Sequence, residues 1–216
     1  MTPVPLDPDR LPPIDVVVIS HNHYDHLDRG TVRRLGNGPT WYVPLKMRRW
    51  FVRQGITNVV ELDWWERSEY GDLEIACTPA KHFSQRNLLN FNKVLWCSWV
   101  ISGGGRTVYF AGDTGYGPHF GEVAERAGPI DLALLPIGAY NPEWFMLAVH
   151  LNPAQAVQAH VDLGATRTIG MHWGTFILTD EPLEEPPRLF LESAQERGLS
   201  DDAAIIMRHG ETVVLP

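Results

Sequence analysis

The chain has 216 residues, of which 44% are hydrophobic and 20% charged, and its formal net charge is −8. This length and composition predict one globular domain and exclude a disordered or collagen-like protein, and no run approaches the ~18 apolar residues of a membrane span. The excess of acidic residues argues against a partner such as DNA or RNA, because binding along a nucleic acid requires dense basic side chains.

Residues 1–13 contain five prolines and are expected to form an extended lead to a single domain over residues 14–216. After this lead, β-branched apolar runs alternate with helical segments. The predicted strands are Ile14–Ser20, Thr40–Val43, Asn58–Glu61, Leu73–Thr78, Val94–Ile101, Thr107–Ala111, Asp131–Leu135, Arg167–Gly170, Ala204–Met207 and Thr212–Leu215. The predicted helices are Arg29–Leu35, Leu45–Gln54, Phe120–Ala127, Pro153–Leu163 and Pro187–Arg197. This alternation predicts an α/β protein with helices packed outside the sheets.

Two features bear on the cellular environment. Cys77 and Cys97 lie in apolar, strand-like runs, which favours reduced thiols in the core over a disulfide. No basic segment followed by an apolar one marks a secretory signal, so a cytoplasmic protein or one at the periphery of a membrane is expected.

The densest group of potential metal ligands follows the first predicted strand directly. Within Ser20–His26, the residues His21, His23, Asp25 and His26 supply imidazole nitrogens and a carboxylate, which are ligands that Zn²⁺ prefers. In an extended chain His21 and His23 point to the same side and could share one metal. Asp25 and His26 lie beyond the strand and could serve a second metal beside it. The alternative is a polar surface loop with chance histidines.

Three more candidates stand just past predicted strand ends. His82 follows Leu73–Thr78, Asp113 follows Thr107–Ala111, and His172 follows Arg167–Gly170. Loops at strand ends of layered α/β folds commonly carry functional residues, because the sheet holds them rigidly. We therefore expect these side chains to join the first group.

The order His21-x-His23-x-Asp25-His26, with His82, Asp113 and His172 after it, resembles the metallo-β-lactamase superfamily. Further motifs resemble the zinc hydrolases of the N-acylphosphatidylethanolamine-hydrolysing phospholipase D family. These motifs are Gly112–Tyr116 (GDTGY), Pro136–Tyr140 (PIGAY), Trp144–Met146 (WFM), His150–Pro153 (HLNP) and His172–Thr175 (HWGT). The resemblance covers nearly the whole chain from about Ile14 and implies a metallo-β-lactamase-like αββα sandwich. Several strands precede the metal motif in such proteins, so a truncated chain that lacks N-terminal strands of the first sheet is expected.

The resemblance also implies two Zn²⁺ ions, with Mn or Fe as alternatives for the same ligand types. The positions that match the ligands are His21, His23 and His82 for the first zinc, Asp25, His26 and His172 for the second, and Asp113 for both. A hydroxide between the two metals is the implied nucleophile, and Asp25 could orient it or take up its proton. Asp25 and Asp113 are therefore the expected catalytic residues.

His150 matches a substrate-binding histidine near the phosphate of the phospholipase substrate. The alternative is a surface histidine beside a helix. The three remaining histidines, His119, His160 and His209, are interpreted as loop, helix and surface residues.

The expected function is a dinuclear zinc-dependent hydrolase of the phospholipase D type, a phosphodiesterase acting on N-acyl-phosphatidylethanolamine-like lipids. A metal-dependent lactonase or ester hydrolase with a small ester substrate is the first alternative, because the same metals could attack a carbonyl carbon. An inactive, truncated metal-binding remnant is the second. The expected partners are the substrate and a peripheral membrane contact, without nucleic acid, and an oligomer is compatible with the pattern.

Two aromatic or basic segments have more than one interpretation. The segment Leu45–Arg53 could contact anionic lipid head groups, but a helix that covers the sheet with solvated arginines is favoured. Trp64 and Trp65, with Trp41 and Tyr42, could line a lipid site or pack in the core.

Overall fold

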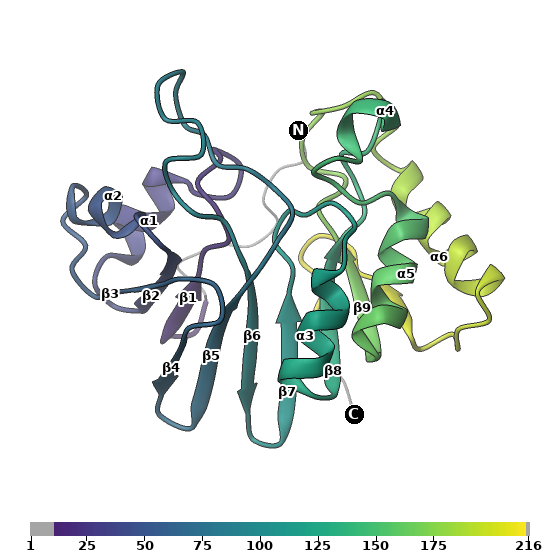
Figure 1. Cartoon of the computed structure of the whole chain (residues 1–216), viewed down its shortest axis with the longest axis horizontal. Helices are drawn as coiled ribbons and strands as arrows, with labels where there is room; N and C mark the ends of the chain where they lie inside the picture. Colours follow the sequence, from purple (N-terminus) through teal and green to yellow (C-terminus); the bar gives the residue numbers. More distant parts are fainter. Residues whose placement is uncertain (1–10, 215–216) are drawn as a thin grey trace.

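The computed structural model describes residues 11–214, so most of the expected N-terminal lead lies outside the described residues. Two sheets pack face to face, and helices cover the outer face of each (Figure 1). The expected αββα sandwich is therefore confirmed.

The smaller sheet is parallel and has the strand order β1-β2-β3. Its strands are β1 (Val16–Val18), β2 (Thr40–Pro44) and β3 (Val59–Leu62). Helices α1 (Arg29–Leu35) and α2 (Arg48–Val52) connect them. Among the described residues β1 lies at the edge of this sheet and pairs with β2 alone.

The larger sheet has the order β10-β9-β8-β7-β6-β5-β4. Its strands are β4 (Arg67–Tyr70), β5 (Leu73–Thr78), β6 (Ser98–Gly103), β7 (Arg106–Phe110), β8 (Ile130–Pro136), β9 (Ala165–Met171) and β10 (Ala204–Ile206). The helices of this half are α3 (His119–Ala127), α4 (Glu143–Met146), α5 (Pro153–Leu163) and α6 (Glu185–Glu196).

The alternation of side chains along β2 builds two cores at once. Trp41 and Val43 point toward α1 and α2 and pack with Phe51, whereas Tyr42 points between the sheets and packs near Trp99. All five are almost completely buried. Because side chains alternate along a strand, a β-branched and aromatic run can cover both faces of a buried sheet. Trp41 and Tyr42 are thus core residues.

The outer face of the larger sheet carries a third apolar cluster. Phe120 of α3, Val157 of α5 and Phe190 of α6 pack against buried residues of β7 and β8. Helix α5 is well specified by its sequence, since the side chain of Asn152 accepts from Gln155 N and Gly164 adopts a left-handed conformation at the end. Its predicted bounds are confirmed.

Several predicted elements have different ends, such as α2, which was expected over Leu45–Gln54, and β1, which was expected over Ile14–Ser20. Five differences are larger. Strand β4 and the single-turn helix α4 were not expected, because a polar edge strand (RSEY) and a four-residue helix have no clear periodicity. Strand β6 begins at Ser98 rather than Val94, since Leu95 N and Cys97 N donate to Leu45 O and Ser20 O outside the sheet. Residues 212–214 do not form the predicted last strand. His119 begins α3 instead of lying in a loop.

The topology brings the ends of distant strands to one edge. Strand β5 is antiparallel to β6, and β6 is antiparallel to β7, so β5 and β7 run in the same direction. Strands β8 and β9 are parallel to β7. The loops that follow β5, β7, β8 and β9 therefore emerge at the same edge, at the top of Figure 1.

Candidate metal centre

The seven predicted ligand positions come together at this edge, although they are spread over residues 21–172. They form two groups, and within each group the potential ligand atoms lie within 4.8 Å of one another. The first group is His21, His23 and His82, and the second is Asp25, His26, Asp113 and His172. Each group lies on loops at the ends of strands of the two sheets, which hold these side chains in place.

The first group consists of three imidazoles that face one another. His21 Nε2 lies 3.0 Å from His23 Nδ1, and His82 Nε2 lies 3.3 Å from the same atom. Behind them, Ser20 Oγ lies 3.0 Å from His21 Nδ1 and the Val149 carbonyl lies 3.0 Å from His82 Nδ1. Contacts of this kind on the far ring nitrogen orient an imidazole toward a metal.

The second group joins two imidazoles to two carboxylates. His26 Nε2 lies 3.1 Å from Asp25 Oδ2, 3.1 Å from Asp113 Oδ2 and 3.2 Å from His172 Nε2. His172 has a positive φ of 62°, a backbone conformation that a non-glycine residue adopts rarely and that often marks a functional site.

Asp113 lies between the two groups. One carboxylate oxygen, Oδ2, is 3.8 Å from both His21 Nε2 and His82 Nε2 and 3.1 Å from His26 Nε2. The other oxygen, Oδ1, is 3.3 Å from His172 Nε2. Asp113 thus lies where one carboxylate could contact ions in both groups.

The electrostatics of the two groups differ. Burial lowers the pKa of His82 to about 3 and that of His21 well below 6.5, so both imidazoles are neutral at neutral pH. Burial also acts on His26, but the carboxylates of Asp113 and Asp25 outweigh it and raise the pKa of His26 to about 10. The first group offers free lone pairs to a metal, whereas metal binding at the second must release a proton.

The donor set fits divalent metal ions. Buried His172 Nδ1 has no hydrogen-bond partner among the described residues, and Asp113 Oδ1 has none beyond its 3.3 Å ion-pair contact with His172 Nε2. Unpaired polar atoms in a buried site are costly, and closely facing imidazole nitrogens cannot all donate to one another. Cations held by these nitrogens and carboxylate oxygens would remove this cost.

Arg86 connects the first ligand loop to a distant segment. Its Nη1 donates to Leu27 O at 2.7 Å and to Asn22 O at 3.0 Å. Its guanidinium also stacks 4.2 Å from the ring centre of Tyr24. This one side chain therefore holds both ends of the segment that carries His23, and the sequence motifs did not indicate its role.

His150 is buried beside both groups, so the alternative interpretation as a surface histidine is wrong. Its ring lies 5.2 Å from that of His82 and 5.7 Å from that of His172, and burial lowers its pKa to about 4. Its Nδ1 has no partner among the described residues. His119 and His160 are buried too and contact Thr hydroxyls, which explains them as core residues.

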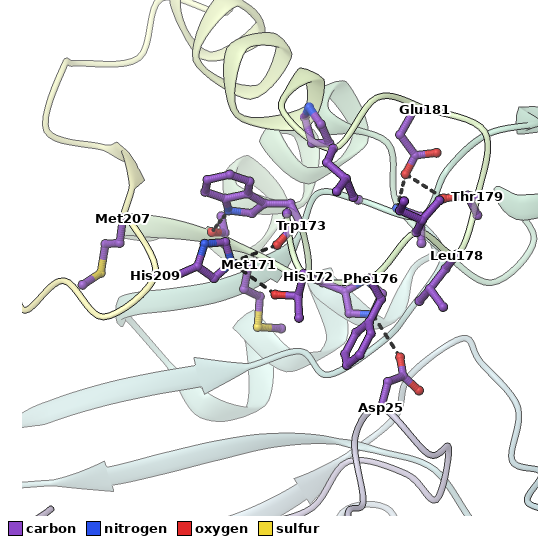
Figure 2. Close-up of a pocket in the computed structure, with 18 of the residues that line it drawn as sticks. Asp25, Met171, His172, Trp173, Phe176, Leu178, Thr179, Glu181, Met207 and His209 are labelled. Atoms are coloured by element: carbon purple, nitrogen blue, oxygen red, sulfur yellow. Dashed lines mark hydrogen bonds and ion pairs between the residues drawn. The ribbon is translucent and has the colours of Figure 1, made fainter. Parts of the chain in front are cut away.

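A cavity of about 470 Å³ opens beside the second group. Figure 2 shows Asp25 and His172 at one side of it and the apolar side chains of Met171, Phe176 and Leu178 around it. The lining carboxylate of Glu181 accepts hydrogen bonds from the backbone N of residues 139 and 141. The cavity therefore combines an apolar wall with a polar end at His172.

The αββα fold and the paired His/carboxylate groups define a metal-dependent hydrolase. A family model described as beta-lactamase superfamily domain matches residues 1–173, and the chain belongs to this family.

Individual relatives agree with this assignment. The chain is 41% identical to N-acyl-phosphatidylethanolamine-hydrolyzing phospholipase D 1 of Caenorhabditis elegans and 39% identical to the mitochondrial enzyme of that name from Saccharomyces cerevisiae, over 97% and 93% of this chain. It spans 63% and 45% of the lengths of these relatives. Among solved structures, Igni18, a metallo hydrolase of Ignicoccus hospitalis, matches with a TM-score of 0.71 and 27% identity, over 92% of this chain and 78% of Igni18.

Neither cysteine forms a disulfide: Cys77 and Cys97 are free and buried, as expected.

None of the helices within residues 11–214 has the length and apolar character that crossing a bilayer requires.

Proposed function

We propose that this chain is a dinuclear zinc hydrolase that cleaves the phosphodiester of N-acyl-phosphatidylethanolamine-like lipids. The observation that carries this proposal is that the Asp113 carboxylate lies within 4 Å of imidazoles of both groups. The second group in turn borders a cavity with an apolar wall, which Asp25 and His172 line. The two phospholipase D relatives support the choice of a phospholipid over other esters.

In this proposal His21, His23 and His82 would hold the first zinc, Asp25, His26 and His172 would hold the second, and Asp113 would contribute to both. Bound zinc ions would supply a water molecule of lowered pKa and stabilise negative charge on the phosphoryl oxygens. Asp25 belongs to the second group and also lines the cavity, where its carboxylate can orient the water and take up its proton. The water oxygen would bond to phosphorus while the bond between phosphorus and the N-acylethanolamine oxygen breaks. The proton that Asp25 took from the water would pass to this departing oxygen.

The cavity offers a place for an acyl chain. Phe176, Ile177 and Leu178 line it from one loop, and Met171 and Leu183 add further apolar surface. Transfer of methylene groups from water to such a wall is favourable by about 0.8 kcal/mol each. We propose that this wall selects a lipid whose phosphate then lies at the polar end of the cavity, beside His172 and the metals.

Metal analysis and product analysis on a folded monomer test this proposal. About two zinc ions per chain, with release of phosphatidic acid and N-acylethanolamine, is the expected result. Turnover of lactones without turnover of phosphodiesters would favour the lactonase, and aggregated protein without metal would favour the inactive remnant.

Replacing His150 by Gln tests whether this residue binds the phosphate. We expect phosphodiester turnover to fall about 10- to 100-fold, because a buried hydrogen bond to a charged group contributes about 1.5–3 kcal/mol. Lactone turnover by the same variant is the internal control and should change much less. Equal losses on both substrates would show that His150 has no phosphate-specific role.

Replacing Arg86 by Lys should weaken zinc affinity about 10- to 100-fold, the usual effect of losing a contact behind the ligands. A lysine lacks the planar group that reaches both Asn22 O and Leu27 O while stacking on Tyr24. Competition with a chelator measures the affinity, and exposed Arg29→Lys on α1 is the matched control. Unchanged zinc affinity in the Arg86 variant would rule out this positioning role.

A further inference from the structure

The loop between β5 and β6 exposes apolar side chains at its tip. Leu88, Leu89 and Phe91 are 93%, 82% and 56% exposed. The side chain of Asn90 holds the loop's own backbone, since its Oδ1 accepts from the backbone N of residues 86 and 87. Figure 1 shows this loop rising above the rest of the molecule. A cluster of three exposed apolar side chains at one loop tip marks a surface that binds a partner.

A cationic groove lies at the base of the same loop. The cations that line it are Lys46, Arg48, Arg49, Arg53 and Lys93, with Glu61 as the only lining carboxylate. The Lys and Arg ion pairs within residues 11–214 involve other cations, and Glu61 accepts from the backbone N of Arg48. In a chain with net charge −8, this groove is an unusual concentration of positive charge.

The apolar tip and the cationic groove form one surface. Lys93 follows the tip and lines the groove, and Leu95 N donates to Leu45 O at 2.9 Å. Arg86 of the loop lies 5.1 Å from the ring centre of Trp50 on α2. We call Leu88, Leu89, Phe91 and the five groove cations the docking face.

We propose that the docking face binds an anionic phospholipid bilayer, with the apolar tip inserted and the groove cations at the lipid phosphates. Basic clusters attract anionic leaflets, and neighbouring exposed apolar side chains add burial in the bilayer. A second copy bound through the same face is disfavoured, because that contact would bring two cationic grooves together. This proposal extends the proposed function by naming the surface that presents the lipid, and vesicle binding tests it without turnover.

The docking face lies close to the candidate metal centre. Phe91 contacts Phe83, whose ring lies 5.8 Å away, and Phe83 contacts both His82 at 4.8 Å and His23 at 4.5 Å. A continuous row of rings thus joins the tip to the first group of imidazoles. A bilayer seated on the docking face would hold its lipids next to the site.

Sedimentation of the full chain with vesicles tests whether the groove cations contribute to membrane binding. The wild type should bind phosphatidylcholine vesicles that contain phosphatidylglycerol, and binding should weaken with salt. The double variant Arg49→Gln, Arg53→Gln should bind about 25-fold more weakly, since each cation near an anionic surface contributes about 1 kcal/mol, or about fivefold. Arg106→Gln with Arg188→Gln removes the same charge elsewhere and should leave binding within about twofold.

The apolar tip is tested in the same assay. Leu88→Ser with Leu89→Ser should weaken binding at least about tenfold, because two leucines lose their burial in the bilayer. Val161→Ser with Leu191→Ser, exposed positions on α5 and α6, is the matched control. Equal wild-type binding to pure phosphatidylcholine, wild-type affinity in either docking-face variant, or concentration-dependent dimers that these variants abolish would overturn the proposal.

The two proposals fail separately. Turnover of N-acyl-phosphatidylethanolamine in detergent micelles without binding to vesicles would overturn the docking face alone. Vesicle binding that depends on Arg49, Arg53, Leu88 and Leu89, without turnover of any phosphodiester, would support the docking face and overturn the proposed function.

Discussion

Replacing Asp113 by Asn should reduce turnover at least about 100-fold and prevent the site from holding two metal ions. Asp113 is the one described side chain whose carboxylate lies within 4 Å of imidazoles of both groups. An amide keeps the shape but removes the charge, and loss of a contact merely behind a metal ligand already costs 10- to 100-fold. Metal content by elemental analysis and turnover on a phosphodiester are the measurements.

The metal-free form of this variant gives an independent signal. The carboxylates of Asp113 and Asp25 raise the pKa of His26 to about 10, so protonation of His26 stabilises the folded state. This contribution is fully present below about pH 6.5 and is lost as the pH rises through about 10. In Asp113→Asn the pKa of His26 should fall. The stabilising contribution of protonated His26 should therefore be lost at a lower pH than in the wild type.

Titration of the His26 ring by NMR and urea unfolding across this pH range measure the shift. The exposed Asp202→Asn is the control and should change neither metal content nor the titration of His26. A doubly loaded, fully active Asp113→Asn protein would exclude Asp113 as a shared ligand.

The sequence predicted much of the candidate site because the information there is local. His21, His82, Asp113 and His172 each follow a recognisable strand, and parallel strand directions bring such positions to one edge. The resemblance then sorted them into two groups, and the structure brings the same residues together.

The features that the sequence did not predict depend on contacts between distant segments. The contact of Arg86 with the carbonyls of Asn22 and Leu27 spans about 60 residues, and no periodic pattern records it. The burial of His150 also follows from its neighbours rather than from its own motif.

The basic segment Leu45–Arg53 packs as a helix that covers the sheet, which is the interpretation that the sequence favoured. Met47 and Phe51 are buried in the core as expected for a covering helix, while the arginines are exposed. The burial of one face of this helix could be predicted from the spacing of its apolar residues along the sequence. The groove formed with Lys93 could not be predicted without the fold, because Lys93 lies 40 or more residues beyond this segment.

Replacing Gly138 by Ala should destabilise the metal-free protein by about 2–3 kcal/mol, the upper range for overpacking. A methyl group there would overlap the carbonyl oxygen of His172 and approach its carbonyl carbon to 3.3 Å and Trp173 Cα to 3.4 Å. These are backbone atoms, which cannot move aside as the end of a flexible side chain can. The φ of Gly138 lies outside the left-handed range, so the close approach alone causes the loss.

The same substitution should also weaken metal binding, since His172 must move with its backbone. Gly121→Ala on α3 is the matched control, because its added methyl group meets nothing within 4 Å. Alanine is favoured over glycine within a helix, so this control should gain about 0.5–1 kcal/mol. Urea unfolding of both metal-free variants should show changes of opposite sign in the free energy of unfolding. Competition for zinc with a chelator shows whether Gly138→Ala also weakens metal binding at the second group. A Gly138→Ala protein as stable as the wild type would mean that the loop after β9 can shift freely, which would contradict a His172 held in place by the end of β8.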